Sequence, residues 1–190
     1  MRQIRIPSEL KGRMFSTKEA ARKGLTFYDL RKMVENGAVH KIARGLYQAA
    51  EADFSDEEAY TAASLQIGSP NAICLVSALA HYQLADAIPK RVWMMVDASK
   101  RTKYRNIRLL RTRNPRWNIG IEKKEGYWIT SLERTLVDAI IYRRLIGTNV
   151  AMEALRKANK NSPATLGRLV DMAKKLKVYH RIQPYLEALA

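Results

Sequence analysis

The 190-residue chain contains almost none of the features that hold secreted or membrane proteins together. Cys74 is its single cysteine, so an internal disulfide is excluded and a reducing compartment is expected. No apolar run approaches the roughly 20 residues that a membrane-spanning helix needs. The first residues, MRQIRIPSEL, lack the apolar centre of a signal peptide. We therefore expect a cytoplasmic protein that has no contact with a membrane.

Negative charge is also scarce. The chain has 18 Asp and Glu against 34 Lys and Arg, which leaves a formal net charge of +16. The excess positive side chains repel one another in a compact state, so an anionic partner is expected, and nucleic acid is the first candidate. A membrane surface is disfavoured because no segment pairs a long apolar face with a basic one.

Residues 15–48 contain the clearest helix-capping and turn signals of the chain. Ser16 precedes a run of helix formers, and Glu19 follows it at the spacing of a capping box. Gly24 stands where the first helix should end, and Thr26 provides a second N-cap. This pattern predicts two short helices joined by a tight turn, as in the DNA-binding helix-turn-helix.

The second helix of this pair should run from Phe27 to Asn36. Its apolar residues recur at helical spacing and predict one buried stripe, formed by Phe27, Leu30, Met33 and Val34. After Gly37, strand-forming residues on either side of Arg44-Gly45 predict a β-hairpin. We interpret residues 1–50 as a winged helix-turn-helix domain.

The opposite face of the second helix and the hairpin should contact DNA. Arginine bonds guanine in the major groove, while Thr, Tyr and Lys serve base edges or phosphates. The candidates are Thr26, Tyr28, Arg31 and Lys32 on the helix and Lys41 and Arg44 on the hairpin. The alternative interpretation is a solvated basic helix beside an ordinary hairpin.

The charge reverses after this segment. Residues 1–50 have 11 Lys and Arg against four Asp and Glu, whereas residues 51–58 contain five acids and no base. We place a linker at 49–55 and a second domain at 51–190. Ser55 and Glu58 predict a capped helix that continues to Ile67.

The second domain should be a mixed α/β unit that ends in helices, which makes the whole chain α+β. An almost entirely apolar segment, Asn71–Leu84, predicts a buried helix. Apolar runs predict strands at 92–96, 107–111, 118–122 and 126–129. Helices are expected near 130–142, 150–158, 162–176 and 178–189.

A second basic surface is expected at residues 100–116, which contain eight basic residues and no acid. Interleaved aromatics suit phosphates and exposed bases, and the partner is either a nucleic acid or an acidic protein. The alternative is an edge strand defended by charge. The basic residues are Lys100, Arg101, Lys103, Arg105, Arg108, Arg111, Arg113 and Arg116.

Signs of catalysis are weak. A restriction-type nuclease site can be assembled from Asp97, Glu122 and Lys124, but Glu-x-Lys arises often by chance in a lysine-rich chain. The Asp-x-Asp pair of a nucleotidyltransferase is absent after Gly68-Ser69. Cys74 and the histidines lack metal-ligand spacing. We expect no catalytic residues, no metal and no cofactor.

Taken together, the chain resembles the AbiEi-family antitoxins, which are transcriptional regulators of bacterial type IV toxin–antitoxin loci linked to abortive phage infection. Four passages carry the resemblance: the helix-turn-helix followed by Arg44-Gly45-Leu46-Tyr47, the segment Ser77–Ala80, the strand at 92–96 and, most specifically, residues 130–138, TSLERTLVD. The short segment before the helix-turn-helix departs from the family's fuller first helix.

The resemblance implies a repressor whose winged helix binds inverted repeats in the promoter of its own operon. It also implies a non-catalytic C-terminal domain that neutralises a nucleotidyltransferase-like toxin, directly or indirectly. We expect a monomer or a weak dimer in solution. Two alternatives stay open: the metal-dependent nuclease with a DNA-binding arm, and a regulator that responds to a small effector and has no toxin partner.

Overall fold

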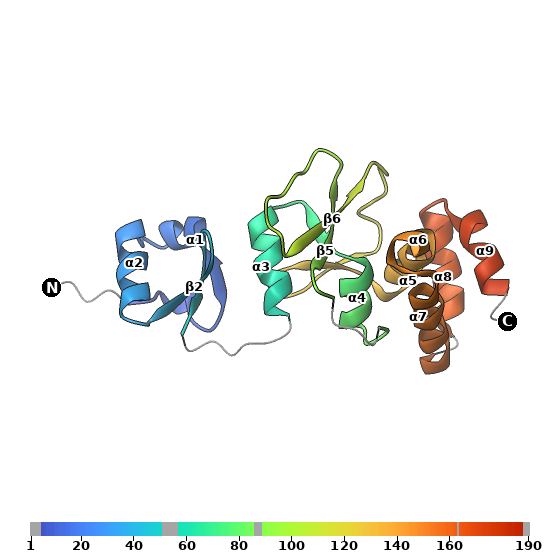
Figure 1. Cartoon of the computed structure of the whole chain (residues 1–190), viewed down its shortest axis with the longest axis horizontal. Coiled ribbons are helices and arrows are strands. Elements are labelled where there is room, and N and C mark those ends of the chain that lie inside the picture. Colours follow the sequence, from blue (N-terminus) through green and yellow to red (C-terminus); the bar gives the residue numbers. More distant parts are fainter. Residues whose placement is uncertain (1–4, 51–56, 86–88, 163, 188–190) are drawn as a thin grey trace. The chain divides into compact units, whose positions relative to one another are not determined.

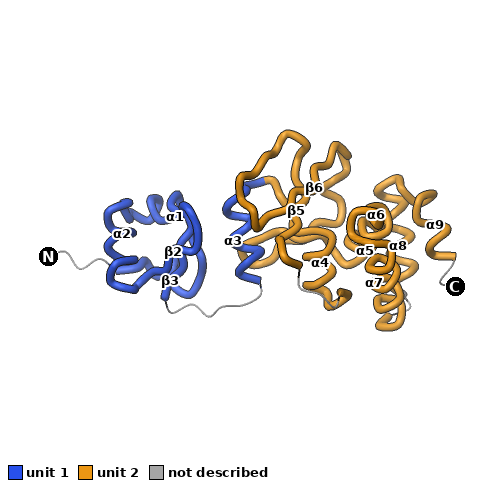
Figure 2. The backbone as a smooth tube through the Cα atoms, viewed as in Figure 1, with its two compact units in different colours: residues 1–69 blue, residues 70–190 orange. Residues whose placement is uncertain are grey.

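The structure is a computed structural model that describes residues 5–50, 57–85, 89–162 and 164–187. The overall class is α+β: a winged helix-turn-helix is followed by a mixed α/β unit that ends in helices (Figure 1). This confirms the fold class predicted from the sequence. The chain forms two compact units, residues 1–69 and residues 70–190 (Figure 2).

Unit 1 is built on a three-stranded antiparallel sheet in the order β1-β3-β2. Helices α1 and α2 pack against one face of this sheet and α3 against the other. The strand β1 was not predicted, because only its pairing with β3 makes so short a segment extended. In chain order the elements are a 3-10 turn at Ser8–Leu10, β1 (Met14–Ser16), α1 (Thr17–Arg22), α2 (Phe27–Glu35), β2 (Val39–Ala43), β3 (Leu46–Ala49) and α3 (Glu58–Ile67).

The alternation of side chains along the strands explains this layering. Phe15 and Tyr47 are paired in register, lie on the same face and stack with ring centroids 6.1 Å apart. They form one core with Leu30 and Met33 of α2, which are fully buried. Leu46, one residue away from Tyr47, points to the other face and packs with Ala62 of α3. Each helical layer is therefore anchored by alternate residues of the same strand.

The division between the units falls at a different place from the linker predicted at 49–55. Helix α3 belongs to unit 1 because it packs on β1 and β3. The amide of Gln48 donates to the Glu58 carboxylate at 2.7 Å, which ties β3 to the start of this helix. The predicted cap Ser55 lies outside the described residues.

Unit 2 contains a five-stranded mixed sheet in the order β6-β5-β4-β8-β7. The β4–β8 and β5–β6 pairs are parallel, and the β4–β5 and β7–β8 pairs are antiparallel. The elements are β4 (Asn71–Ile73), α4 (Leu75–His81), β5 (Val92–Asp97), β6 (Ile107–Thr112), β7 (Ile121–Lys123), β8 (Trp128–Thr130), α5 (Leu132–Ile141), α6 (Arg143–Ile146), α7 (Thr148–Asn161), α8 (Ala164–Lys175) and α9 (Tyr179–Glu187).

The prediction of a single helix over Asn71–Leu84 was wrong. Its first three residues form β4, the central strand, which bonds with β5 on one side and β8 on the other. A strand buried on both faces has the same continuous apolar composition as a buried helix, so periodicity alone does not distinguish them. The helix begins only at Leu75, and the Ser77 hydroxyl accepts a hydrogen bond from the Trp93 amide at 3.0 Å.

The segment 118–122 was predicted as one strand, but only its last two residues belong to β7. Gly120 adopts a left-handed φ of +71°, and a Cβ atom there would lie 2.9 Å from the Arg134 Cβ and 2.8 Å from the Met172 terminal methyl. The chain therefore turns at Gly120, in a space that only glycine fits. Helix α5 packs against α7, α8 and α9 in the largest hydrophobic core of the unit.

Candidate nucleic-acid interface

Two capping boxes place the helices of the helix-turn-helix. The Ser16 hydroxyl accepts from the Glu19 amide at 3.2 Å, and the Glu19 carboxylate accepts from the Ser16 amide at 2.7 Å. Thr26 and Asp29 make the same reciprocal pair at the start of α2, at 3.1 and 2.8 Å. Each box satisfies amides that a helix start leaves without partners, so both helices begin at defined residues.

The turn between the helices depends on Gly24, whose φ is +79°. A left-handed residue after the last helical turn reverses the chain at low cost when it is glycine. Leu25 then inserts into the core with 8% of its surface exposed. The predicted capping residues and turn are therefore confirmed by the geometry.

The outer face of α2 is open to solvent. Tyr28 is 63% exposed, and the Arg31 and Lys32 side chains are 72% and 48% exposed. Both cations bind Glu35, with Arg31 Nε at 2.9 Å and Lys32 Nζ at 2.8 Å from its carboxylate. Hydrogen bonds from Lys32 and then Arg31 hold the pKa of Glu35 below its usual value. The face therefore carries two long cationic side chains gathered around one carboxylate.

Phe27 does not belong to the buried stripe, contrary to the sequence-based prediction. It is 68% exposed, whereas Leu30 and Met33 are fully buried. Helical side chains tilt toward the N-terminus, so at the first position of a helix a side chain extends past the helix end into solvent. No periodicity rule detects this, because the spacing of Phe27 to Leu30 is that of a buried pair.

The hairpin places Lys41 and Arg44 differently. Lys41 pairs with Tyr47 and therefore lies on the α1/α2 face of the sheet, at its exposed β2 edge. Arg44 stands in the turn, where the Gly45 carbonyl accepts hydrogen bonds from the Thr17 amide at 2.9 Å and hydroxyl at 3.2 Å. Among the described residues, neither cation has a carboxylate within ion-pair distance.

The predicted second basic surface is divided by β6. Arg108 and Arg111 are three residues apart on this edge strand, so their side chains point to opposite faces. The Arg108 guanidinium lies 4.2 Å from the Trp93 ring centroid, and Arg111 Nε donates to the Lys100 carbonyl at 3.0 Å. Arg101 donates to three carbonyls of its own loop. Lys103, Arg105 and Arg113 are exposed as well, while Lys100 and Arg116 are half-buried.

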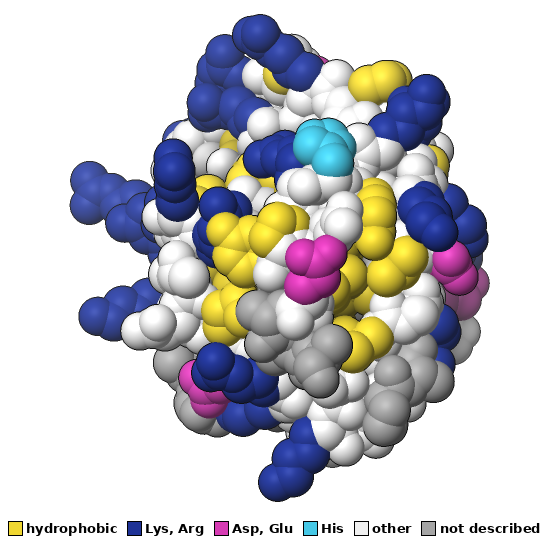
Figure 3. Space-filling view, turned by 90° about the vertical axis from the view of Figure 1, so that its right-hand side faces the viewer, with side chains coloured by type: hydrophobic (Ala, Val, Ile, Leu, Met, Phe, Trp, Pro, Cys, Tyr) yellow, Lys and Arg dark blue, Asp and Glu magenta, His cyan; other side chains and the backbone are white. Residues whose placement is uncertain are grey.

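Further positive charge in unit 2 was not predicted as a site. Residues 70–190 have 23 Lys and Arg against nine Asp and Glu, a net charge of +14. The view onto the C-terminal helices shows Lys and Arg side chains around a more apolar centre, with few carboxylates (Figure 3). These cations are spread over several helices, so no short run in the sequence signals them. The members on α6–α9 and in the turn before α9 are Arg143, Arg144, Arg156, Lys157, Lys160, Arg168, Lys174, Lys175, Lys177 and Arg181.

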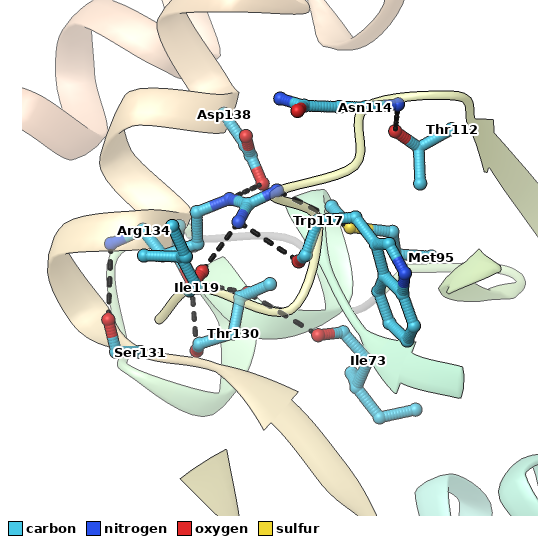
Figure 4. Close-up of polar contacts among 11 residues, drawn as sticks. Ile73, Met95, Thr112, Asn114, Trp117, Ile119, Thr130, Ser131, Arg134 and Asp138 are labelled. Carbon is cyan, nitrogen blue, oxygen red and sulfur yellow. Dashed lines mark hydrogen bonds and ion pairs between the residues drawn. The ribbon is translucent and has the colours of Figure 1, made fainter. Parts of the chain in front are cut away.

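The segment TSLERTLVD at 130–138 is buried except at Leu132 and Glu133, and its polar side chains bond to several other segments of the unit (Figure 4). Arg134, 3% exposed, donates to the Asp138 carboxylate at 2.8 Å and to the carbonyls of Trp117 and Ile119 at 3.1 and 2.6 Å. The Thr130 hydroxyl reaches the Ile73 carbonyl at 3.3 Å. These bonds join α5 to the loop before β7, and β8 to the central strand β4, so this motif is structural.

The pair Arg134–Asp138 is not an ordinary surface ion pair. Burial raises the pKa of Asp138 to about 6, and the attraction of Arg134 opposes this only in part. The i, i+4 spacing seen in the sequence is confirmed as a salt bridge, and its partners are both buried. A second ion pair, between Glu133 and Arg168 at 2.8 Å, joins α5 to α8 at the surface.

The candidate nuclease residues are not brought together. Glu122 on β7 pairs with Ile129 on β8, and across the sheet Ile129 is in register with Ile73 on β4 and Met94 on β5. Strands β8 and β4 therefore lie between Glu122 and β5, the strand that ends at Asp97. Three strand spacings amount to about 14 Å, and ligands of one metal must lie within about 4 Å of each other. Asp97 instead accepts from Ser99, which lowers its pKa, and Lys124 pairs with Glu122 at 3.4 Å.

Within the described residues, no three His, Cys, Asp or Glu side chains are grouped closely enough to hold a metal ion. Burial raises the pKa of the Cys74 thiol, which lies in the core of unit 2. The same described part of the chain contains no helix with the length and apolarity needed to cross a bilayer.

Comparison with known proteins is informative for unit 1. Residues 5–50 match the family model described as "Transcriptional regulator, AbiEi antitoxin". The matched residues include both capped helices and the hairpin. No curated protein matches the chain. Among solved structures, the RV2827C protein from Mycobacterium tuberculosis is similar with a TM-score of 0.48 and 14% sequence identity, over 92% of this chain and 76% of that one.

Proposed function

From the match of residues 5–50 to the AbiEi antitoxin family of transcriptional regulators, we propose that the chain is a repressor of its own operon. Helix α2 enters the major groove of promoter DNA, and the β2–β3 hairpin contacts the flanking backbone. Two copies occupy the two halves of an inverted repeat, while the free protein is a monomer or a weak dimer. The observation that carries the proposal is the match of the capped helix pair and hairpin to this family.

The exposed face of α2 supports this placement. Arg31 is the candidate for bidentate contact with guanine, and Tyr28 and Lys32 are candidates for base edges or phosphates. Thr26 has its hydroxyl engaged in the capping box, so its role is to position the first turn of α2. Lys41 and Arg44 have no competing ion pair among the described residues and are suited to neutralise phosphates.

The test is binding of the full chain to the duplex upstream of its own reading frame. We expect Arg31→Ala combined with Arg44→Ala to weaken binding at least about fivefold, because removing a bidentate arginine–guanine interaction costs about 1–3 kcal/mol. The slope of log affinity against log salt should fall by about one for each phosphate that the variant no longer neutralises. Fluorescence anisotropy at several salt concentrations measures both quantities.

The matched control removes the same charge from unit 2. Arg156 and Lys160 are exposed on α7, so Arg156→Ala combined with Lys160→Ala preserves the proposed reading face. Retained affinity in this control, together with weaker binding by the Arg31/Arg44 variant, supports the placement. Equal weakening in both variants would show that net charge, and no particular face, determines binding, and would overturn it.

We also propose that unit 2 supplies the antitoxin function, directly or indirectly, against a nucleotidyltransferase-like toxin encoded next to it. Support comes from the family of the N-terminal segment and from the large positive charge of unit 2. In this proposal the chain is not an enzyme, needs no cofactor and acts in the cytoplasm. The exposed cations Lys103, Arg105 and Arg113 are the first candidates for toxin or nucleic-acid contact.

Co-expression with the product of the neighbouring reading frame tests this second role. Growth should be restored by the wild-type chain and by the Arg31/Arg44 variant, since that variant changes only the proposed DNA contacts. Replacing Lys103, Arg105 and Arg113 by alanine should reduce rescue. Size-exclusion chromatography of the two purified proteins separates direct binding from an indirect effect. Toxicity that persists with wild-type chain would contradict the antitoxin role and leave the DNA-binding role unaffected.

A further inference from the structure

The first turn of α2 exposes two adjacent aromatic side chains. Phe27 is 68% exposed and Tyr28 63% exposed, and among the described residues of unit 1 they are the only large hydrophobic side chains so exposed. Tyr28 has a hydroxyl that water can bind, but Phe27 has no polar atom. Because its ring is mostly exposed to water, Phe27 contributes little to the stability of unit 1. An exposed apolar ring beside a second exposed aromatic points to contact with a ligand.

The local geometry directs Phe27 outward. The Thr26–Asp29 capping box fixes the residue immediately before it, and Phe27 is the first residue of α2. Its side chain therefore tilts beyond the helix end. Arg31 lies one turn further on the same side of the helix, with its side chain 72% exposed. In recognition helices of this motif, the N-terminal residues are those that reach the base edges.

Only one apolar group is available to such a side chain in the major groove. The 5-methyl group of thymine projects there, whereas the other base edges present hydrogen-bond donors and acceptors. We propose that Phe27 packs against thymine 5-methyl groups and thereby gives the chain a preference for thymine beside the base read by Arg31. This inference rests on the proposed DNA-binding function and names the base chemistry that the same helix recognises.

The charge around Phe27 favours DNA over a protein partner. Arg31 and Lys32 follow it on the same exposed face, and Lys32 Nζ lies 5.9 Å from the Tyr28 ring centroid. An apolar contact bordered by cations matches a thymine step bordered by phosphates. A second copy of the chain would bring the same cations against each other. Contact between two copies through Phe27 is the alternative that the experiment separates from DNA contact.

The experiment uses the full chain and a duplex obtained by binding selection from random sequences. Each thymine of the selected site is replaced in turn by deoxyuridine, which lacks only the 5-methyl group. We expect about a fourfold loss of affinity for each methyl group that Phe27 covers, the value for burial of one such group. Phe27→Ala should bind the thymine duplex more weakly and should bind the thymine and uridine duplexes alike. Phe27→Leu, which keeps an apolar contact, should retain part of the preference.

The control for loss of an exposed apolar side chain is Leu145→Ala. Leu145 is 43% exposed on α6 in unit 2, and its removal should leave the thymine preference intact. The Phe27 variants should fold, because alanine and leucine are good helix formers and the capping bonds involve other side chains.

Two outcomes overturn the inference while the DNA-binding function stands: no uridine substitution weakens binding, or Phe27→Ala keeps the full preference for thymine. If Phe27→Ala changes only the sedimentation behaviour of the free protein, the side chain is a contact between copies and the inference also fails. Absence of any sequence-selected duplex, by contrast, would be a failure of the proposed function itself.

Discussion

Replacement of Arg134 by methionine should lower the free energy of unfolding of unit 2 far more than a substitution at its surface. The guanidinium is buried and donates to the Asp138 carboxylate and to the Trp117 and Ile119 carbonyls. Methionine occupies a similar volume to the stem of arginine but donates no hydrogen bond. Arg134→Met therefore leaves one carboxylate and two carbonyl oxygens without their donor inside the unit.

The size of the effect follows from these three groups. Removing one partner of a buried ion pair costs about 3–5 kcal/mol, and each deprived carbonyl adds about 1 kcal/mol or more. A loss of about 5 kcal/mol is comparable with the whole stability of a typical domain, about 5–15 kcal/mol. The double variant Arg134→Met/Asp138→Leu removes the stranded charge as well and should recover most of the ion-pair part of this loss.

Tryptophan fluorescence in urea isolates the response of unit 2. Trp93, Trp117 and Trp128 are the three tryptophans of the chain, and all lie within residues 70–190. Unfolding of unit 1 therefore does not change this signal directly. The control is Arg168→Met, which breaks the exposed pair with Glu133 and should cost at most about 1 kcal/mol.

The reasoning would be refuted if Arg134→Met shifted the free energy of unfolding by less than about 1 kcal/mol, the range of a surface pair. It would equally be refuted if the double variant were no more stable than the single one. In that case the cost would come from poorer packing and not from the stranded carboxylate.

Two further predictions concern charge. Glu35→Gln should free Arg31 and Lys32 from their shared carboxylate. The affinity for duplex DNA of any sequence should then rise several-fold, and its salt dependence should become steeper. Fluorescence anisotropy on a non-specific duplex measures both effects, and a weaker affinity would contradict the prediction. Asp138 has a pKa raised to about 6, so its contribution to stability is present below pH 4 and is lost as pH rises through about 6. The urea midpoint of the wild type should accordingly fall relative to that of Asp138→Asn between pH 4 and 7, and a constant difference would be inconsistent with this pKa.

Most of unit 1 could be predicted because its signals are local. Ser16 with Glu19 and Thr26 with its own capping partner determine where two helices begin, within four residues of sequence. Gly24 permits the turn between them whatever the rest of the chain does. The charge of the outer helix face could likewise be read from spacing alone.

Other features depended on segments that are far apart in the chain. Asn71–Ile73 is a strand because β5 and β8 lie on either side of it, and a run of apolar residues does not encode that choice. The separation of Asp97 from Glu122 followed from the order of the strands, which ruled out a shared metal site between them. Arg134 and Asp138 were visible as a helical pair, but their burial and their carbonyl partners were not.

Phe27 combines both kinds of information. Its spacing to Leu30 placed it on the buried stripe, and its position at the first residue of α2 removed it from that stripe. Helix caps and turns are decided by hydrogen bonds among neighbouring residues, so they can be read directly from the amino-acid order. Strand order, burial and the exposure of a helix end depend on which distant surfaces exclude water, and only the folded chain determines that.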